Sequence, residues 1–217
     1  LTSDDVVTTR TVLHESIPLT GTIVSGTYAD NNIKNYTHGQ FQSVYDYPFL
    51  SSSSNHIFDL TVGYPATSGL SGSASTQNAK KINMYNQMAQ VMLGYNSASQ
   101  GEIEKFESDL TLNNDKIMSE VFFVNFARLL TKDQIKKGTF SLTVGTGSWA
   151  TPFSHTKTLT DASASATGGT GTSIGGDYGV LYSGSSPAGQ GACGLVFYQA
   201  GIAVLTASVW NGVSEFN

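Results

Sequence analysis

The side chains that most often bind metals or attack substrates are few in this sequence and lie far apart. The single cysteine, Cys193, stands between alanine and glycine without an acid or a base beside it, and we interpret it as a small buried apolar residue. Asp109, Asn113 and Asp115 lack the spacing and the central glycine of a calcium-binding EF-hand loop. No metal-ligand spacing occurs among the four histidines, which are His14, His38, His56 and His155. The sequence therefore predicts no metal site and no cofactor.

Motifs for covalent catalysis and for phosphate binding are incomplete. Segment 69–72 reads Gly-Leu-Ser-Gly and lacks the register of the Gly-x-Ser-x-Gly turn that exposes a nucleophilic serine. The glycine-rich runs 145–147 and 168–171 lack the lysine and the helix start of a phosphate-binding loop. Two carboxylates that meet only in space would leave no sequence signal, so such a pair stays open. We predict that the protein is not an enzyme and has no catalytic residues.

The composition favours a β-rich protein with a weakly charged surface. Charged residues make up 12% of the 217 residues, about half of the usual share. The net charge of −5 and the pI near 5.2 disfavour nucleic acid as a partner. Hydrophobic residues make up 39%, with 10 tyrosines and 11 phenylalanines, which argues against disorder over most of the length.

The most apolar stretch of the chain, residues 191–210, is the predicted core of the fold. A membrane helix needs about 20 nearly uninterrupted apolar residues, but three polar residues and three glycines interrupt this run. We therefore predict no membrane span but two strands covered on both faces, 195–198 and 202–209, joined by a tight turn at 199–201. A third strand is expected at 178–182. The residues predicted to form the core of an assembly are Leu195, Val196, Phe197, Ile202, Val204 and Trp210.

Apolar residues at intervals of three and four predict one amphipathic helix at 76–93, ended by Gly94. Its buried face is expected to carry Ile82, Tyr85, Ala89 and Met92.

Alternating or continuous apolar residues predict further strands at 56–62, 120–130 and 140–144. In the first of these strands, Ile57, Asp59 and Thr61 are expected on one face. A Thr-x-x-Gln capping box at 131–134 predicts a short helical turn ended by Gly138.

Polar and glycine-rich tracts separate these elements. We expect an N-terminal arm at 1–28, a polar insertion at 96–119 and a long loop at 146–177. The predicted fold is mainly β, an antiparallel sandwich or a barrel-like sheet, in a single domain that spans residues 1–217.

The aromatic side chains between residues 29 and 64 allow two interpretations. They can pack in the core, which is the more common role, or they can form a contact surface for a glycan or a protein. The candidate contact residues are Tyr36, Tyr45 and Tyr47.

Five runs of the sequence resemble a virion structural protein encoded by contractile-tailed phages of marine cyanobacteria. Together they cover just under half of the chain and are long enough to be specific. The resemblance implies a structural role and brings no catalytic residues with it. The runs are Thr11–Gly21, Ile33–Tyr64, Lys80–Tyr95, Phe122–Gly145 and Gly194–Val209.

Resemblance and composition together predict a structural component of a tailed-phage virion, located in the tail or baseplate, that acts through subunit–subunit assembly. Its expected partners are other copies of itself and other virion proteins. A receptor- or glycan-binding module of a tail fibre, with a glycan receptor as its partner, stays open as one alternative. A head or neck protein stays open as another.

Overall fold

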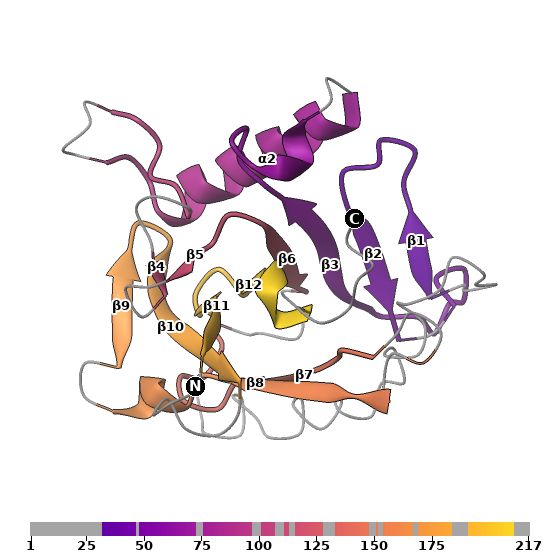
Figure 1. Ribbon diagram of the computed structural model, residues 1–217. Coiled ribbons are helices and arrows are strands. Elements are labelled where there is room, and N and C mark those ends of the chain that lie inside the picture. Colours follow the sequence, from indigo (N-terminus) through magenta and orange to yellow (C-terminus); the bar gives the residue numbers. More distant parts are fainter. Residues whose placement is uncertain are drawn as a thin grey trace.

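The computed structural model describes residues 32–46, 48–72, 76–96, 101–106, 111–112, 116–127, 133–147, 151, 154–166, 169–183 and 191–210. Ten antiparallel strands form one sheet, and one α-helix, α2 (Thr76–Met92), lies against it (Figure 1). The strands are β1 (Ile33–Asn35), β2 (Gln42–Tyr45), β3 (His56–Gly63), β6 (Val121–Phe126), β7 (Ser141–Gly145), β8 (Thr156–Thr160), β9 (Thr170–Ser173), β10 (Gly176–Ser183), β11 (Ala192–Phe197) and β12 (Ile202–Thr206). The described residues thus confirm a mainly-β fold with one helix.

The order of strands in the sheet is β1-β2-β3-β6-β12-β11-β10-β8-β7, and β9 also pairs with β10. Two further short strands, β4 (Thr111–Leu112) and β5 (Lys116–Ile117), pair only with each other. Three 3-10 turns complete the described elements: η3 (Gly69–Ser71), η6 (Ala162–Ser165) and η7 (Ala207–Trp210).

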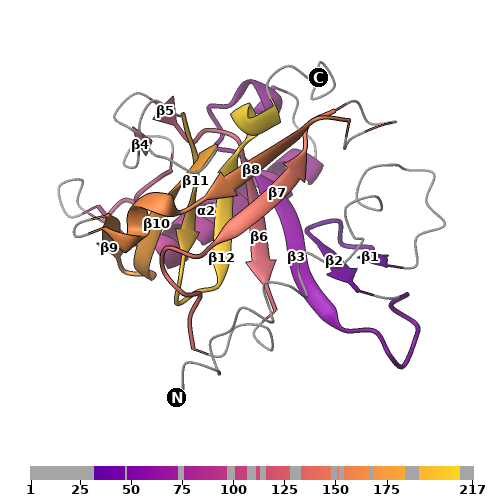
Figure 2. The same ribbon diagram turned by 90° about the horizontal axis from the view of Figure 1, so that it is seen from below.

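The sheet curls, so that both faces of its central strands are covered. Helix α2 crosses one face, and β7 and β8 cross the other (Figure 2). Because β6, β12 and β11 lie between these two layers, every residue of β11 and β12 is buried. This confirms the prediction of two strands covered on both sides.

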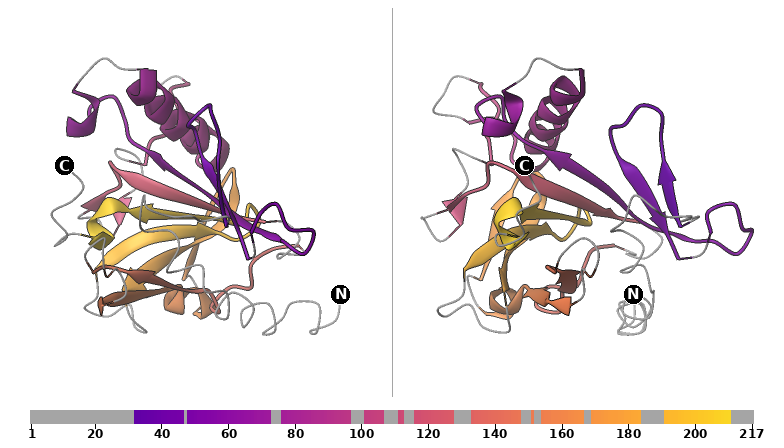
Figure 3. Two further views of the ribbon diagram at one scale, coloured as in Figure 1. Left: turned by 90° about the vertical axis from the view of Figure 1, so that its right-hand side faces the viewer. Right: turned by 45° about the vertical axis from the view of Figure 1, so that its right-hand side comes forward.

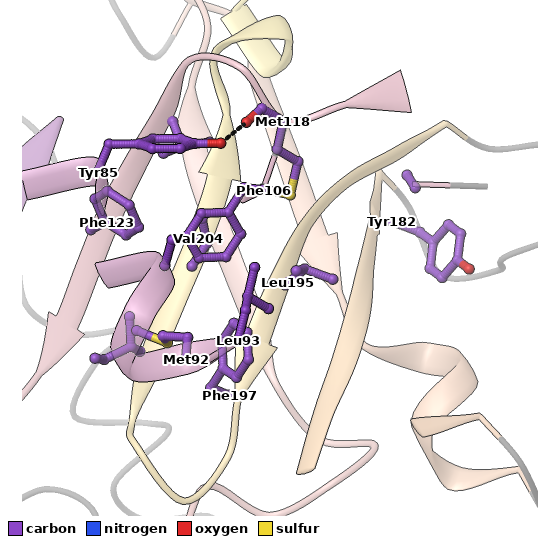
Figure 4. Packing of buried hydrophobic residues seen from close by; sticks show 14 residues of the cluster. Tyr85, Met92, Leu93, Phe106, Met118, Phe123, Tyr182, Leu195, Phe197 and Val204 are labelled. Carbon is purple, nitrogen blue, oxygen red and sulfur yellow. Dashed lines mark hydrogen bonds between the residues drawn. The ribbon is translucent and has the colours of Figure 1, made fainter. Parts of the chain in front are cut away.

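The core on the helix side is built around a buried tyrosine of α2. The Tyr85 ring packs edge-on against Phe106, with the ring centroids 5.6 Å apart, and its hydroxyl donates to the Met118 carbonyl oxygen at 2.9 Å (Figure 4). Phe106 packs in turn on Phe123 of β6. The tract 96–119 therefore supplies two fully buried side chains, Phe106 and Met118, to the core, although its composition is polar.

The core on the opposite side is closed by β7, β8 and the C-terminal turn. Phe140, next to β7, packs edge-on against Phe126, with the ring centroids 5.8 Å apart. The Trp210 indole packs on Phe122 and donates from Nε1 to the Gly145 carbonyl oxygen at 3.0 Å. These contacts connect β7, at one end of the sheet order, to β6 in its middle, so the sheet curls back on itself.

The C-terminal hairpin turns at Gly201, within the predicted turn at 199–201. Gly201 has φ +69°, a backbone conformation that side chains with a Cβ rarely adopt, and its N–H donates to the Phe197 carbonyl oxygen. Strand β12 ends at Thr206 instead of residue 209, because η7 turns the chain so that Trp210 meets Gly145.

Helix α2 follows its prediction closely. Tyr85, Ala89 and Met92 are buried, and Gly94 at φ +87° ends the helix with its N–H on the Ala89 carbonyl oxygen. The predicted burial of Ile82 is wrong in degree, since this side chain is only half-buried. The first half of α2 contacts the polar turn between β1 and β2 instead of the apolar core.

The long loop predicted at 146–177 is wrong. This tract contains β8, η6, β9 and the first two residues of β10. Strand β7 pairs with β8, and β10 pairs with β9, so both strands of the tract have backbone partners. Threonine-rich segments form solvent-facing strands readily once a partner strand exists. The helical turn predicted after residue 131 is also not found among the residues described there, since 133–138 form bends and a turn. The expected N-terminal arm, 1–28, lies outside the described residues.

The contact between β3 and α2 gives a test of this layer arrangement. A Cβ added to Gly63 would lie 2.8 Å from Phe123 Cε2 and 3.1 Å from the Tyr85 Cα, whereas a Cβ on Gly69 would meet nothing within 4 Å. We expect Gly63→Ala to lower the free energy of unfolding by about 1–3 kcal/mol, because the helix must move away from the sheet. Gly69→Ala, the matched control, should change it by less than about 1 kcal/mol. Denaturant unfolding measures both values, and equal effects of the two substitutions would contradict the packing.

Candidate functional site

A cluster of hydroxyl, imidazole and carboxylate groups lies on β2, on β3 and on the residue that follows β1, on the same sheet face as α2. We call it the β2–β3 cluster; its residues are Tyr36, Ser43, Tyr45, His56 and Asp59. Antiparallel pairing places Ser43 opposite Asp59 and Tyr45 opposite His56. Alternate residues of a strand share a face, so Ser43 and Tyr45 point the same way as Asp59.

A β-bulge brings His56 into this cluster. Between the pairs Val44–Phe58 and Tyr45–His56, β2 advances by one residue and β3 by two. In a regular strand, residues three apart point to opposite faces, so His56 and Asp59 would lie on opposite sides of the sheet. The extra residue of the bulge returns His56 to the face of Asp59.

Asp59 is the centre of the cluster. Its Oδ1 accepts a hydrogen bond from Ser43 Oγ at 2.5 Å and lies 2.8 Å from His56 Nε2. The Tyr36 hydroxyl lies 3.1 Å from Ser43 Oγ. Burial raises the pKa of Tyr45 above its ordinary value of 10.0, and the neighbouring Tyr36 and Asp59 raise it further.

This arrangement differs from a nucleophilic triad. In a Ser-His-Asp triad the imidazole lies between the hydroxyl and the carboxylate, so that it can accept the hydroxyl proton. Here the carboxylate of Asp59 lies between Ser43 and His56. Ser43 is also only 3% exposed. The cluster is therefore a hydrogen-bond network that joins the end of β1 to β2 and β3.

The turn between β1 and β2 is held on α2 by two lysines. Lys80 Nζ donates to the His38 carbonyl oxygen at 2.6 Å, and Lys81 Nζ donates to the Gln40 carbonyl oxygen at 3.1 Å and to Thr61 Oγ1 at 3.3 Å. Partial burial lowers the pKa of Lys81, and the positive charge of Lys80 lowers it further. These bonds fix the β2–β3 cluster relative to the helix.

Of the candidate contact aromatics, Tyr36 and Tyr45 both belong to this cluster, and Tyr47 lies outside the described residues. The Tyr36 ring stacks on His38, with centroids 5.0 Å apart and planes 9° apart, and it also contacts Phe41. Tyr45 packs on His56. Both tyrosines are half-buried, so much of their ring surface is used inside the chain.

A second cluster surrounds a buried carboxylate that sequence reasoning missed. Asp161 is 1% exposed and accepts three hydrogen bonds, from the backbone N–H groups of Gly138 (2.7 Å) and Phe140 (2.9 Å) and from the Tyr198 hydroxyl (2.9 Å). Three donors provide the partners that a buried carboxylate requires. Asp161 therefore joins the end of β8, the turn before β7 and the residue after β11.

The surroundings of Tyr198 favour its neutral form. Burial raises the pKa of Tyr198, and the negative charge of Asp161 and the hydrogen bond to it raise it further. Lys137 Nζ lies 5.9 Å from the centre of the Tyr198 ring and 2.5 Å from Asp177 Oδ2. Hydrogen bonds from Lys137 and Thr172 hold the pKa of Asp177 below its ordinary value.

No local signal marks either cluster in the sequence. Asp161 stands in a Thr-Asp-Ala-Ser segment that is typical of a turn, and its three donors lie more than twenty residues away along the chain. The bond between Ser43 and Asp59 needs the β2–β3 register, and the contact of His56 with Asp59 needs the bulge.

The predicted assembly-core residues lie inside the chain. Leu195, Val196, Phe197, Ile202 and Val204 are buried in its own two cores, and Trp210 is half-buried. The role of these six residues in an assembly stays a prediction.

No protein-family model, curated protein or solved structure matches the chain. Among the described residues, no helix has the length and the apolar character needed to cross a membrane. Within the same part of the chain, no three histidine, cysteine or acidic side chains gather into a set that would hold a metal ion.

The bond between Tyr198 and Asp161 predicts an alkaline instability. Since the pKa of Tyr198 is raised in the folded state, the unfolded chain loses this proton first, and folding stability falls as the pH rises above the ordinary value of 10.0. Tyr198→Phe should cost about 1–3 kcal/mol at pH 7, because Asp161 loses one donor. The stability gap between the two proteins should then narrow by up to about 1.4 kcal/mol per pH unit above 10.

Denaturant unfolding of both proteins at several pH values measures this gap, and the interval from pH 7 to 9 serves as the internal control. A gap that stays constant through pH 11 would show that Tyr198 is not held neutral by the fold.

Proposed function

We propose that the chain is a structural component of a tailed-phage virion, part of its tail or baseplate, and that it acts through subunit–subunit assembly. The five runs that resemble virion structural proteins support this role. The carboxylates of the two polar clusters, Asp59 and Asp161, hydrogen-bond to groups of the same chain and hold strands together, which is a structural use of these groups. In this proposal the protein is not an enzyme.

The observation that carries the proposal is an exposed apolar patch at the end of α2. We call it the Val91 patch, and it consists of Val91, Tyr95 and Ile174, which are 64%, 56% and 74% exposed. Ile174 lies at the β9–β10 turn, and this turn is fixed on the helix end because Ser173 Oγ and the Gly175 N–H both donate to the Met92 carbonyl oxygen.

Large apolar side chains grouped on the surface mark contact sites more often than single ones do. Ile174 lies against the chain beside Tyr95, since a Cβ added to Gly94 would be 3.0 Å from Ile174 Cγ2. The patch is thus built by the fold from two distant segments, and an apolar contact with another virion chain would cover it.

Few charges oppose close contact between subunits elsewhere on the surface. The solvent face of β7 and β8 carries hydroxyl side chains, and Thr143 Oγ1 lies 3.0 Å from Thr158 Oγ1 on this face. A surface that presents hydroxyl groups brings no like-charge repulsion when copies of one chain come together.

A receptor- or glycan-binding role is the second candidate, and the shape of the chain gives it one argument. Strands β1 and β2 project at one edge of the molecule (Figure 3), and the turn between them carries the ring group Tyr36, His38 and Phe41. Sugar binding uses open aromatic faces, whereas these three rings contact one another. Assembly is therefore the better supported function.

The proposal is tested on purified phage particles. Mass spectrometry of washed particles should detect the chain, and gold-labelled antibody should mark the tail or the baseplate in electron micrographs. Labelling of the head or neck would support that alternative instead. Absence of the chain from washed particles would refute a virion role.

The Val91 patch gives a more specific test. Ile174→Asp places a charge in the centre of the patch, so we expect a folded protein whose incorporation into particles falls at least about tenfold, as for a contact residue worth about 1.4 kcal/mol or more. The control is Ser53→Asp, which adds the same charge at an exposed turn residue and should incorporate normally. Equal incorporation of both variants would exclude the patch from the contact.

A further inference from the structure

Strand β7 forms one end of the sheet among the described strands, and its hydrogen-bond pattern shows which groups point away from β8. The Thr146 N–H donates to the His155 carbonyl oxygen at 2.8 Å, and the Asp161 N–H donates to the Phe140 carbonyl oxygen. In an antiparallel pair, alternate residues direct both backbone groups to the partner strand. The even-numbered residues of this segment therefore face β8, and the odd-numbered ones face outward.

The side chains of β7 agree with this pattern. Thr143 and Thr158 form a directly opposed pair, and their hydroxyls are 3.0 Å apart, as expected for a pair without mutual backbone bonds. Outside the β8 ladder, the Gly145 carbonyl oxygen accepts from Trp210 Nε1. Among the described residues, no strand pairs with the outward backbone groups of Ser141 and Thr143.

Apart from Trp210, which covers the outward carbonyl oxygen of Gly145, the edge of β7 has none of the features that usually prevent strand addition. Natural edge strands are protected by charges, prolines, bulges or short length. β7 has five residues, Ser-Leu-Thr-Val-Gly, and contains no charge and no proline, and its pairing with β8 is regular. At the other end of the sheet, β1 has only three residues and carries Lys34.

We propose that β7 pairs antiparallel with β7 of a second copy of this chain, about a twofold axis at Leu142. This register places Ser141 of each copy opposite Thr143 of the other, so all four outward groups of these two residues form backbone hydrogen bonds. It leaves the Gly145–Trp210 bond intact. On the inner face, the half-buried Leu142 side chains of the two copies meet.

A second copy fits this edge better than an unrelated strand does, because the edge is complementary to itself. A twofold contact requires each surface to match its own image. Ser141 and Thr143 stand symmetrically on either side of Leu142 and have the same outward pattern of donor and acceptor. Although the chain has a net charge of −5, no charged side chain of β7 opposes the contact. The inference rests on the assembly role proposed above and names the partner for one of its surfaces.

Disulfide trapping tests both the pairing and its register. Directly opposed residues with mutual backbone bonds have Cα atoms about 5.5 Å apart, within the range of about 4.4–6.8 Å that a disulfide spans. A mixture of Ser141→Cys and Thr143→Cys proteins should therefore form a covalent dimer under mild oxidation. Each variant alone should not, because the diagonal neighbours lie about 7–8 Å apart. The natural Cys193 is buried, so disulfide formation by the unsubstituted protein gives the background of this experiment.

Backbone substitution provides the second measurement. Thr143→Pro removes an outward N–H and leaves the β7–β8 ladder in place, since proline is tolerated where its missing N–H faces away from the partner strand. We expect a folded protein whose dimer dissociates at least tenfold more readily in sedimentation velocity. If this variant does not fold, Thr143→Lys keeps the N–H, adds a charge to the edge and should weaken the dimer likewise.

The outcomes separate this inference from the virion role. A dimer unaffected by either Thr143 substitution, or a mixture that forms no more disulfide than the single variants, overturns β7 pairing even if the chain is found in particles. Trapping in the mixture alone, together with dimer loss in the Thr143 variant, supports it even if the chain is absent from them.

Discussion

Burial of β11 and β12 on both faces is the constraint on which the rest of the structure depends. A strand with apolar side chains on both faces needs a layer above and a layer below it. Helix α2 provides the first layer, and β7 with β8 provides the second, which requires the sheet to curl. The two buried strands thus decide where α2 must lie, and Gly63 lets the helix approach closely because it has no side chain there.

Because the sheet curls, some polar groups are buried, and the two polar clusters supply hydrogen-bond partners for them. Where β8 ends and the chain turns under the sheet, Asp161 accepts two backbone N–H groups that would otherwise be buried without partners. Where β2 and β3 extend beyond the two large apolar cores, Asp59 accepts a hydrogen bond from Ser43 on the neighbouring strand and contacts His56 on its own strand. Both carboxylates stabilise strand connections that apolar packing alone does not hold.

The surface differs from these buried clusters, because its groups face away from the chain. Its exposed features are backbone groups at the edge of β7, hydroxyl side chains on β7 and β8, and the Val91 patch at the end of α2. In the proposed assembly, the edge would supply hydrogen bonds, the hydroxyl face would allow close approach without charge repulsion, and the patch would supply apolar burial. Since β7 and α2 lie on opposite sides of the central strands (Figure 1), these surfaces face in different directions.

The sequence by itself determined the elements whose signals are local: the two strands of the C-terminal hairpin, the turn at Gly201, and helix α2 with its end at Gly94. Their signals are apolar periodicity and glycine positions, which short segments carry. Only the tertiary structure decided that the tract 146–177 forms strands, that a bulge brings His56 to Asp59, and that Asp161 meets Tyr198. Each of these depends on a partner distant in the chain, and the same residue types in another register would lie on opposite faces of the sheet.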